Sequence, residues 1–343
     1  MGGEISTLIA MTMQTATSVR TDPSVLVVTR SWDTTANAVI RELQAAGTSV
    51  TRLNTEEFPT TASLELLLGT QEEHAHLQLE DGRSIAASQV TAVYFRRPDP
   101  PLIDESVRDP VMREFAQNES KSALSGFLRL LRARWVNHPS AIAEAELKVL
   151  QLRVARELGF HIPATCITNN PSVARDFFHG NGGRVVAKSL RSPLVSLTPS
   201  LIVYTSPLST SDLEAFDSIR IAPCILQELV EATVELRVTV VGTRLFVAEI
   251  AAKPGQVDWR RTESSATPVC RHQLPEPVSN LCTALISKFG LRFGALDLIL
   301  DTQGRYTFLE LNPNGEWGWL SQIFGNEIAV ALADELVVPN PIH

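Results

Sequence analysis

The alternation of apolar and polar residues is clearest near the C-terminal end, where it predicts a β-hairpin. Two apolar runs, Ala295–Leu300 and Tyr306–Leu311, flank a polar connection that contains Gly304. Such a short glycine-containing connection is typical of two antiparallel strands. The side chains expected together on the apolar face of this hairpin are Leu296, Leu298, Leu300, Leu309 and Leu311.

The opposite face of the hairpin carries oxygen-bearing side chains. Any register that pairs the leucine faces brings Asp297 to the same side as Glu310 and Asn312. Such oxygens suit a hard cation, and Mg²⁺ usually takes one or two carboxylates and completes its shell with water and substrate phosphates. The three residues therefore predict a metal site, with a solvated hairpin face as the alternative.

The N-terminal part begins with a strand, a helix and a second strand. The apolar run Ser24–Thr29 is followed by a helical pattern that begins near Asp33 and stops at Gly47, and Val50–Leu53 is the next strand. This order predicts a right-handed βαβ unit and an α/β domain with a parallel sheet. No G-x-G-x-x-G sequence follows the first strand, so a dinucleotide-binding role lacks its phosphate-binding turn.

A strand at Val90–Phe95 ends in two adjacent cations, Arg96 and Arg97. They fit either an anion site or a structural ion pair. The other elements expected before residue 160 are strands at 65–68 and 76–79, helices at 113–131 and 141–158, and a turn at Trp135–Pro139. Lys148 lies inside the second helix, where a lysine is usually just solvated.

The middle of the chain alternates strands and helices before three closely spaced apolar runs. The elements expected there are strands at 161–168, 184–188 and 202–205, a helix at 171–178, the runs Cys224–Val230, Glu235–Val241 and Arg244–Ile250, and a helix at 278–289. Short turns separate the three runs, which predicts an antiparallel meander. In it, Glu235 and Arg237 share a face that can look into the same cleft as Asp297. Lys188 ends a strand.

Length and charge limit the class of protein. At 343 residues the chain exceeds what one core supports, which predicts two or three lobes. The parts expected are an extension at 1–22, an N-terminal α/β domain at 23–138, a central lobe at 139–225 and a C-terminal lobe at 226–343. The net charge of −8 argues against nucleic acid and against an anionic membrane as partners.

The cysteines and the N-terminus indicate the compartment. The four cysteines lie far apart and form no C-x-x-C, so neither a zinc site nor a disulfide framework is indicated. The apolar patch within residues 1–22 is too short for a secretion signal or a membrane span. We therefore expect a flexible extension and a cytoplasmic protein.

Taken in order, the polar residues between Trp135 and Leu320 resemble those of the ATP-grasp ligases. The residues that carry the resemblance are Lys148, Lys188, Gln227, Glu228, Leu229, Val230, Glu235, Arg237, Asp297, Glu310 and Asn312. The resemblance implies an ATP-grasp fold of the α/β class, with an N-terminal Rossmann-like lobe, a small central α/β lobe and a C-terminal antiparallel α+β lobe.

The family's residue roles carry over to these positions as expectations. Lys148 and Lys188 would contact the ATP phosphates as point charges, and Arg237 would lie near the transferred phosphoryl group. The segment Gln227–Val230 would offer backbone groups to the adenine edge, and Glu235 would accept from the ribose hydroxyls. The expected Mg²⁺ ligands are Asp297, Glu310 and Asn312.

Four short sequence segments are similar, more narrowly, to segments of the ribosomal-peptide maturases that make graspetides, such as the microviridin ligases. The segments are Val25–Asp33 with Leu53–Thr55, Val93–Pro98, Trp135–Pro139 and Asn312–Trp317. The resemblance implies that ATP converts an Asp or Glu side chain of a precursor peptide to an acyl phosphate. A Ser or Thr hydroxyl or a Lys amine of the peptide then attacks it, which gives an ω-ester or ω-amide ring.

Two further residue expectations depend on this reaction. Arg260 would lie near the acyl phosphate, with a loop ion pair to Asp258 as its alternative role. The leader of the precursor would dock beside the central lobe at 205–222. The segment 189–200 departs from the family, because it contains no glycine where many ATP-grasp enzymes have a glycine-rich lid.

Other readings of the chain stay open at this point. A RimK-like ligase that joins small molecules or extends protein termini would use the same ATP site. A nucleotide-binding regulatory protein without turnover is disfavoured, because all three expected metal ligands are present. A symmetric homodimer is the default expectation for a soluble enzyme.

Overall fold

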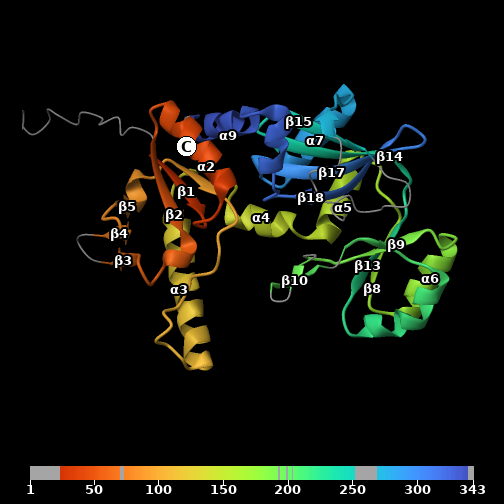
Figure 1. Ribbon diagram of the computed structural model, residues 1–343, viewed down its shortest axis with the longest axis horizontal. Coiled ribbons are helices and arrows are strands. Elements are labelled where there is room, and N and C mark those ends of the chain that lie inside the picture. Colours follow the sequence, from red (N-terminus) through yellow and green to blue (C-terminus); the bar gives the residue numbers. More distant parts are fainter. Residues whose placement is uncertain are drawn as a thin grey trace, which may run out of the picture.

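The computed structural model describes residues 24–69, 73–191, 194–197, 200–202, 204–251 and 269–338. Figure 1 shows an N-terminal domain on one side and two further lobes on the other, one built around β14, β17 and β18 and one around β8, β9 and β13. None of the helices in these ranges combines the length and the apolar character needed to cross a bilayer.

The N-terminal domain is built on a parallel sheet with the order β2, β1, β6, β7. Its strands are β1 (Ser24–Thr29), β2 (Ser49–Asn54), β6 (Ala92–Phe95) and β7 (Arg134–Val136), and its helices are α2 (Thr34–Ala45) and α3 (Pro110–Leu130). Helix α2 begins where Asp33 accepts a hydrogen bond from the N–H of Ala36. The predicted βαβ unit is confirmed.

One part of the predicted N-terminal domain is wrong. The turn expected at Trp135–Pro139 begins instead as strand β7, because Val136 is buried in the core and pairs with Tyr94 of β6. Beside the main sheet lies a small antiparallel one, formed by β3 (Ser63–Leu67), β4 (His74–Gln78) and β5 (Ser84–Ala86). Short 3-10 turns lie at 55–57 and 87–89.

The central lobe pairs β12 (Ser206–Pro207), β9 (Val185–Lys188), β13 (Cys224–Glu228) and β8 (Thr165–Thr168) in that order. Helix α6 (Pro171–Gly180) and the 3-10 helix η3 (Thr210–Arg220) pack on it, with Phe178 and Phe216 in the shared core. The strands β10 (Leu194–Leu197) and β11 (Ser200–Ile202) form a separate hairpin in the segment that lacks glycine.

The position of β13 corrects the predicted meander. It pairs with β8 and β9, whereas β14 pairs with β15 and β17, so the three apolar runs belong to two sheets. A run of apolar residues does not specify its partner, because strand pairing is a long-range choice. The expected lobe boundary between residues 225 and 226 falls inside this strand.

The C-terminal lobe is an antiparallel sheet with the order β16, β15, β14, β17, β18. These strands are β16 (Val269–Arg271), β15 (Arg244–Ala251), β14 (Ala232–Val241), β17 (Phe293–Asp301) and β18 (Tyr306–Asn312). Helix α7 (Glu276–Lys288) covers its apolar face, where Leu236, Val238 and Val240 meet Leu285 and Ile286. The predicted hairpin of β17 and β18 is confirmed.

A β-bulge in β18 moves one predicted core residue to the other face. The register shifts between Asp297 and Leu298, so that Asp297 lies opposite Glu310 and Leu298 lies opposite Phe308. Leu309 is the extra residue and lines a pocket, while Phe308 takes its expected place in the core. The bulge leaves the predicted polar face of the hairpin intact.

The helix predicted over 141–158 is two helices, α4 (Pro139–Ala145) and α5 (Lys148–Leu158). Leu147 between them is extended, and the side chain of Gln151 donates to the carbonyl of Ala145 in place of a helical bond. Lys148 is therefore the first residue of a helix and does not lie within one, as the apolar periodicity had predicted.

The end of the chain returns to the N-terminal domain. After a 3-10 turn at 318–320 come α8 (Ser321–Phe324) and α9 (Glu327–Val337), and α9 packs on α2. One continuous core contains Val25 and Tyr94 of the N-terminal sheet together with Phe293 and Leu332. The N-terminal domain and the C-terminal lobe are therefore joined by buried apolar contacts, whereas the central lobe has a core of its own.

Candidate active site

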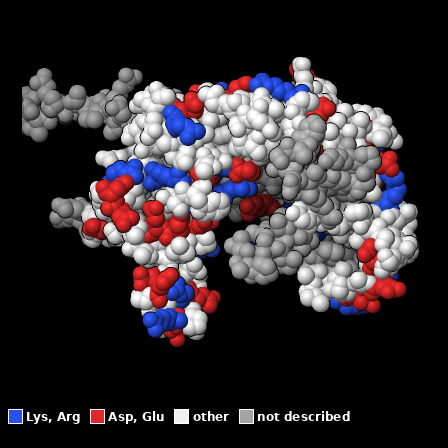
Figure 2. Space-filling model, viewed as in Figure 1, with Lys and Arg blue, Asp and Glu red and all other residues white. Residues whose placement is uncertain are grey.

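A pocket lies where the central lobe faces the C-terminal lobe. It holds about 720 Å³ of space that is partly open to solvent. Strands β9, β13, β14, β17 and β18 contribute polar side chains to its wall: Lys188, Glu228, Glu235, Asp297 and Glu310. In the space-filling view, acidic and basic side chains border a recess between the N-terminal domain and the other two lobes (Figure 2).

Two of the three candidate metal ligands, Asp297 and Glu310, line this pocket, and the third, Asn312, lines the adjoining one. Asp297 and Glu310 are directly opposite each other on paired strands. The amide nitrogen of Asn312 lies 3.3 Å from a carboxylate oxygen of each. In the described ranges no group of three His, Cys, Asp or Glu side chains is arranged to hold a metal, so the amide is an essential member of this set.

These side chains fit a hard cation. Two carboxylates and an amide supply oxygen donors, which Mg²⁺ prefers, and leave positions for water and phosphate. The amide orientation of an Asn is assigned from its hydrogen bonds, and rotation of Asn312 would turn its oxygen toward a bound cation.

Two cations already pair with the carboxylates. The Nζ of Lys148 lies 2.8 Å from Glu310, and Nη1 of Arg237 lies 2.7 Å from Asp297. Lys148 reaches across from the first turn of α5, and Arg237 lies beside Asp297 because β14 and β17 are paired at these residues. The cluster thus holds two positive and two negative charges, all of them next to pocket space.

The second candidate lysine approaches from the central lobe. Lys188 at the end of β9 donates to the side-chain oxygen of Gln227 at 2.7 Å, and Gln227 in turn donates to Thr165 at 3.0 Å. Gln227 is buried, so this chain of bonds orients the lysine on the pocket wall. Lys188 therefore lines this pocket, whereas Lys148 lines the adjoining pocket and pairs there with Glu310, which borders the first.

The segment 227–230 lines the pocket, but part of its backbone is already bonded. The N–H of Glu228 donates to the carbonyl of Ala164 at 2.8 Å, and that of Leu229 donates to Arg184 at 2.9 Å. An adenine edge would therefore be met by the other backbone groups of this segment. Glu235 lies on the same wall, at the start of β14.

Two buried polar residues that the sequence analysis missed hold the metal-ligand candidates in place. The amide of Gln151 bonds both backbone groups of Leu311, the residue between Glu310 and Asn312. Asn137 donates to the carbonyls of Phe293 and Pro313, at 2.8 and 2.9 Å. A polar residue inside an apolar stretch was the only signal of either role.

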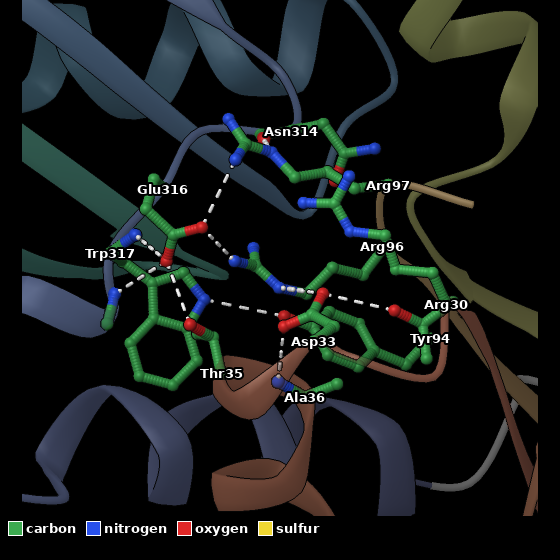
Figure 3. A network of polar contacts seen from close by, with 12 residues as sticks. Arg30, Asp33, Thr35, Ala36, Tyr94, Arg96, Arg97, Asn314, Glu316 and Trp317 are labelled. Carbon is green, nitrogen blue, oxygen red and sulfur yellow. Dashed lines mark hydrogen bonds and ion pairs between the residues drawn. The ribbon is translucent and has the colours of Figure 1, made fainter. Parts of the chain in front are cut away.

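An ionic network centred on a buried arginine joins the N-terminal domain to the loop after β18, where Glu316 is 37% exposed (Figure 3). Arg96 is fully buried and lies 3.1 Å from Asp33 and 2.6 Å from Glu316. Glu316 also accepts from Thr35 and from the N–H groups of Trp317 and Gly318. Of the two roles expected for this arginine pair, Arg96 has the structural one.

The network lowers the pKa of both of its acids. Burial alone would raise the pKa of Glu316, but Arg96, the Gly318 N–H, Thr35 and Arg97 together hold the pKa below its usual 4.5. Burial likewise opposes ionisation of Asp33, and the charge of Arg96 with the Ala36 N–H prevails, so its pKa is also lowered. Both carboxylates are therefore ionised at neutral pH.

Some expectations lie outside the described residues. Arg260, the candidate near the acyl phosphate, belongs to the stretch 252–268, and Ser192 of the lid segment lies outside as well. The proposed leader-docking stretch 205–222 is described as β12 and η3, which pack on α6.

The chain is similar to one family model and to several solved structures. Residues 24–143 match the family model of the MvdD pre-ATP grasp domain. Among curated proteins there is no match. Among solved structures, macrocyclase MdnC of Microcystis aeruginosa MRC, bound with precursor peptide MdnA, is 30% identical with a TM-score of 0.82 over 92% of this chain and 99% of that chain.

Two further solved structures are similar. Macrocyclase MdnB of the same organism is 36% identical with a TM-score of 0.77, again over 92% of this chain and 99% of that one. A RiPP-associated ATP-grasp ligase of Chryseobacterium gregarium, in complex with ADP and a leader and core peptide, is 26% identical with a TM-score of 0.86 over 94% and 100%.

Proposed function

The chain belongs to the ATP-grasp ligases that mature ribosomal peptides, the graspetide maturases, and on that basis we propose how its own residues carry out the reaction. It is an ATP-dependent peptide ligase of the macrocyclase type with an ATP-grasp fold. Its substrate is a ribosomal precursor peptide with a leader and a core, and ATP is consumed to ADP with Mg²⁺ as cofactor.

The pocket between the lobes takes the nucleotide. Lys188 binds its phosphates from the pocket wall and Lys148 binds them from the side of the adjoining pocket, both as compact point charges. The segment 227–230 contacts the adenine edge and Glu235 accepts from the ribose. Mg²⁺ neutralises phosphate charge when bound, and the residues that hold it are Asp297, Glu310 and Asn312.

The ion pairs of the cluster exchange partners when the nucleotide binds. Lys148 leaves Glu310 for a phosphate, and Arg237 turns from Asp297 toward the transferred phosphoryl group. Both residues are then aimed at charge that grows during transfer, which is where fixed cations lower the barrier. Positioning and charge stabilisation are the main protein contributions to phosphoryl transfer.

The reaction has two steps, phosphoryl transfer to the peptide carboxylate and attack on the resulting acyl phosphate. A peptide carboxylate oxygen attacks the γ-phosphorus, the bond to the β-phosphate oxygen breaks, and ADP leaves. A Ser or Thr hydroxyl or a Lys amine of the peptide then attacks the acyl carbon, phosphate leaves with the bonding electrons, and the nucleophile's proton passes to solvent. Arg260 stabilises the acyl phosphate.

The observation that carries this proposal is that Asp297 and Glu310 line one pocket with Lys188, while Arg237 and Lys148 pair with these two carboxylates from the adjoining pocket. The test incubates the protein with Mg-ATP and an acidic peptide, rich also in Thr, Ser or Lys, that is encoded next to its gene. We expect ADP release and loss of water from the peptide by mass spectrometry. Ligation of free amino acids instead, or no loss of water from the peptide, overturns the proposal.

We propose that the enzyme works as a symmetric homodimer. The start of α3 projects from the N-terminal domain (Figure 1) and exposes Val111, Met112 and Phe115, each more than half accessible. A cluster of large apolar side chains on a helix surface is typical of an interface. Light scattering of the wild type and of Phe115→Glu tests it, with a monomeric wild type as the contrary result.

A further inference from the structure

A second pocket adjoins the nucleotide pocket and shares Asp297 with it. It holds about 1730 Å³ by the same measure, more than twice the space of the first. Its charged lining consists of Arg97, Glu146, Lys148, Arg191, Arg237, Asp297 and Glu316. These are four cations and three carboxylates, so this pocket has a net positive charge and suits an acidic ligand.

Two of the four cations are already used by the nucleotide site. Lys148 and Arg237 pair with Glu310 and Asp297, next to the phosphoryl group in the proposed reaction. Arg97 and Arg191 remain, and they line the second pocket from the N-terminal domain and from the central lobe. Arg97 is the one whose backbone and bonding are unusual.

The backbone of Arg97 is in a conformation that favours glycine. Its φ is +43°, and it is the one non-glycine residue with a positive φ among the described ranges. Pro98 follows it, and a residue before proline is normally extended. Glycine would adopt this φ without strain, so an arginine here indicates that the side chain has a task.

The Arg97 guanidinium is only partly engaged (Figure 3). Its Nε donates to the carbonyl of Asn314 at 3.0 Å, and Nη1 lies 3.2 Å from Glu316. A guanidinium has five N–H groups, and no other bond engages the rest within the residues that the structure covers. Glu316 has closer partners in Arg96 and Thr35, at 2.6 and 2.9 Å, so Arg97 is not its main support.

We infer that Arg97 is a specificity-determining residue that binds, in the second pocket, an acidic side chain of the peptide next to the one being activated. The inference rests on the proposed function. The activated carboxylate must reach the phosphoryl group at Arg237 and Asp297. Arg97, which lines the second pocket from the N-terminal domain, therefore binds the carboxylate of a neighbouring peptide residue. A planar guanidinium with open N–H groups binds a carboxylate through two parallel bonds.

The electrostatics of Arg97 agree with an anionic ligand. Burial lowers the pKa of its guanidinium, the nearby charges of Arg96 and Arg30 lower it further, and Glu316 only partly opposes this. A bound carboxylate would offset the repulsion from the two neighbouring arginines. The side chain is 39% exposed, which leaves it accessible from the pocket.

The test compares Arg97→Gln and Arg97→Lys with Arg30→Gln in the full-length enzyme, using the acidic peptide of the previous section. Arg30 is a matched control, because it pairs with Asp99, adds charge to the same cluster and does not line the second pocket. We expect Arg97→Gln to raise the KM for the peptide about 10- to 100-fold, since bonds to charged groups have that effect. The peptide KM of Arg97→Lys should lie between those of the wild type and Arg97→Gln. The KM for ATP should stay unchanged in all three variants.

A second arm leaves the protein unaltered. The acidic residues that flank the cross-linked one are changed to Asn or Gln in the peptide, and the wild-type KM for this peptide must rise by a similar factor. With the neutral peptide, Arg97→Gln must have no further effect. An unchanged peptide KM for either the variant or the neutral peptide overturns the inference. A wild type that dehydrates no peptide overturns the proposed function instead.

Discussion

Two clusters of ion pairs lie close together in this protein, one in the nucleotide pocket and one where the N-terminal domain meets the loop after β18. In the pocket, Lys148 and Glu310 are 18% and 17% exposed. At the domain junction, Arg96 and Asp33 are 0% and 4% exposed. The junction acids also accept backbone N–H groups, and the pocket carboxylates Glu310 and Asp297 accept from the side chains of Lys148 and Arg237.

The difference in exposure distinguishes a cluster that is proposed to take part in the reaction from one that holds two parts of the fold together. A pair that borders open pocket space can exchange partners, because water and phosphate replace the lost contacts. A pair buried with backbone donors cannot, since removal of one partner leaves a charge in low dielectric. Under the proposed function, the same residue types serve catalysis in one place and domain attachment in the other.

The largest expected effect is at the junction. Asp33→Asn keeps the N-cap oxygen of α2 but removes the charge opposite Arg96. We expect the free energy of unfolding to fall by about 3–5 kcal/mol, because Arg96 stays buried with less compensation. Urea unfolding measures this. Asp81→Asn, which breaks the exposed pair with Arg83, should change the free energy of unfolding far less, and an equal loss for both variants contradicts the comparison.

The next effect separates activity from stability in the pocket. We expect Asp297→Asn to lower the rate of peptide cross-linking about 100- to 1000-fold, the range seen when one charge-stabilising group is lost. Stability should fall by less than in Asp33→Asn, because Asp297 is 21% exposed and borders pocket space, whereas Asp33 is 4% exposed. Mass spectrometry and urea unfolding measure the two quantities. A loss of stability as large as that of Asp33→Asn would place Asp297 in the structural class.

A third variant tests whether neutral hydrogen bonds position Glu310 and Asn312 when the ion pairs of the pocket cluster exchange partners. Gln151→Met leaves both backbone groups of Leu311 without their side-chain partner. We expect a loss of about 1–3 kcal/mol in the free energy of unfolding. The KM for Mg-ATP should also rise, since Glu310 and Asn312 flank Leu311. If the KM for Mg-ATP is unchanged, neutral hydrogen bonds do not position these ligands.

The sequence predicted those parts of this comparison that depend on local pattern. Alternation along β17 and β18 brought Asp297, Glu310 and Asn312 to one face, and the βαβ unit followed from periodicity. The break before Lys148 was missed because no glycine or proline interrupts the helical spacing, and a side-chain bond from Gln151 to Ala145, six residues earlier, compensates for it. The partner sheet of β13 was missed because pairing is not local.

The structural cluster was the less predictable of the two. Arg96 next to Arg97 suggested an anion site and an ion pair equally, since nothing local shows which arginine is buried. Glu316 lies 220 residues after Arg96, and the sequence singled it out only as part of the segment Asn312–Trp317 that resembles the graspetide maturases. A buried polar group is recognisable only with its partner, and the fold supplies that partner.

The smallest expected effect is on the pH dependence of the free energy of unfolding, and it arises from Glu316 at the domain junction. The pKa of Glu316 is lower in the folded protein than its usual 4.5, so its contribution to stability is present above that value and is lost as the pH falls through the folded pKa. Glu316→Gln should therefore flatten the fall of the unfolding free energy with pH below about 4.5 and leave the slope near neutral pH unchanged. Urea unfolding of both proteins across this range measures the slope. Parallel curves would show that Glu316 titrates alike in the folded and unfolded chains, and the ionic network would then not be what stabilises the junction.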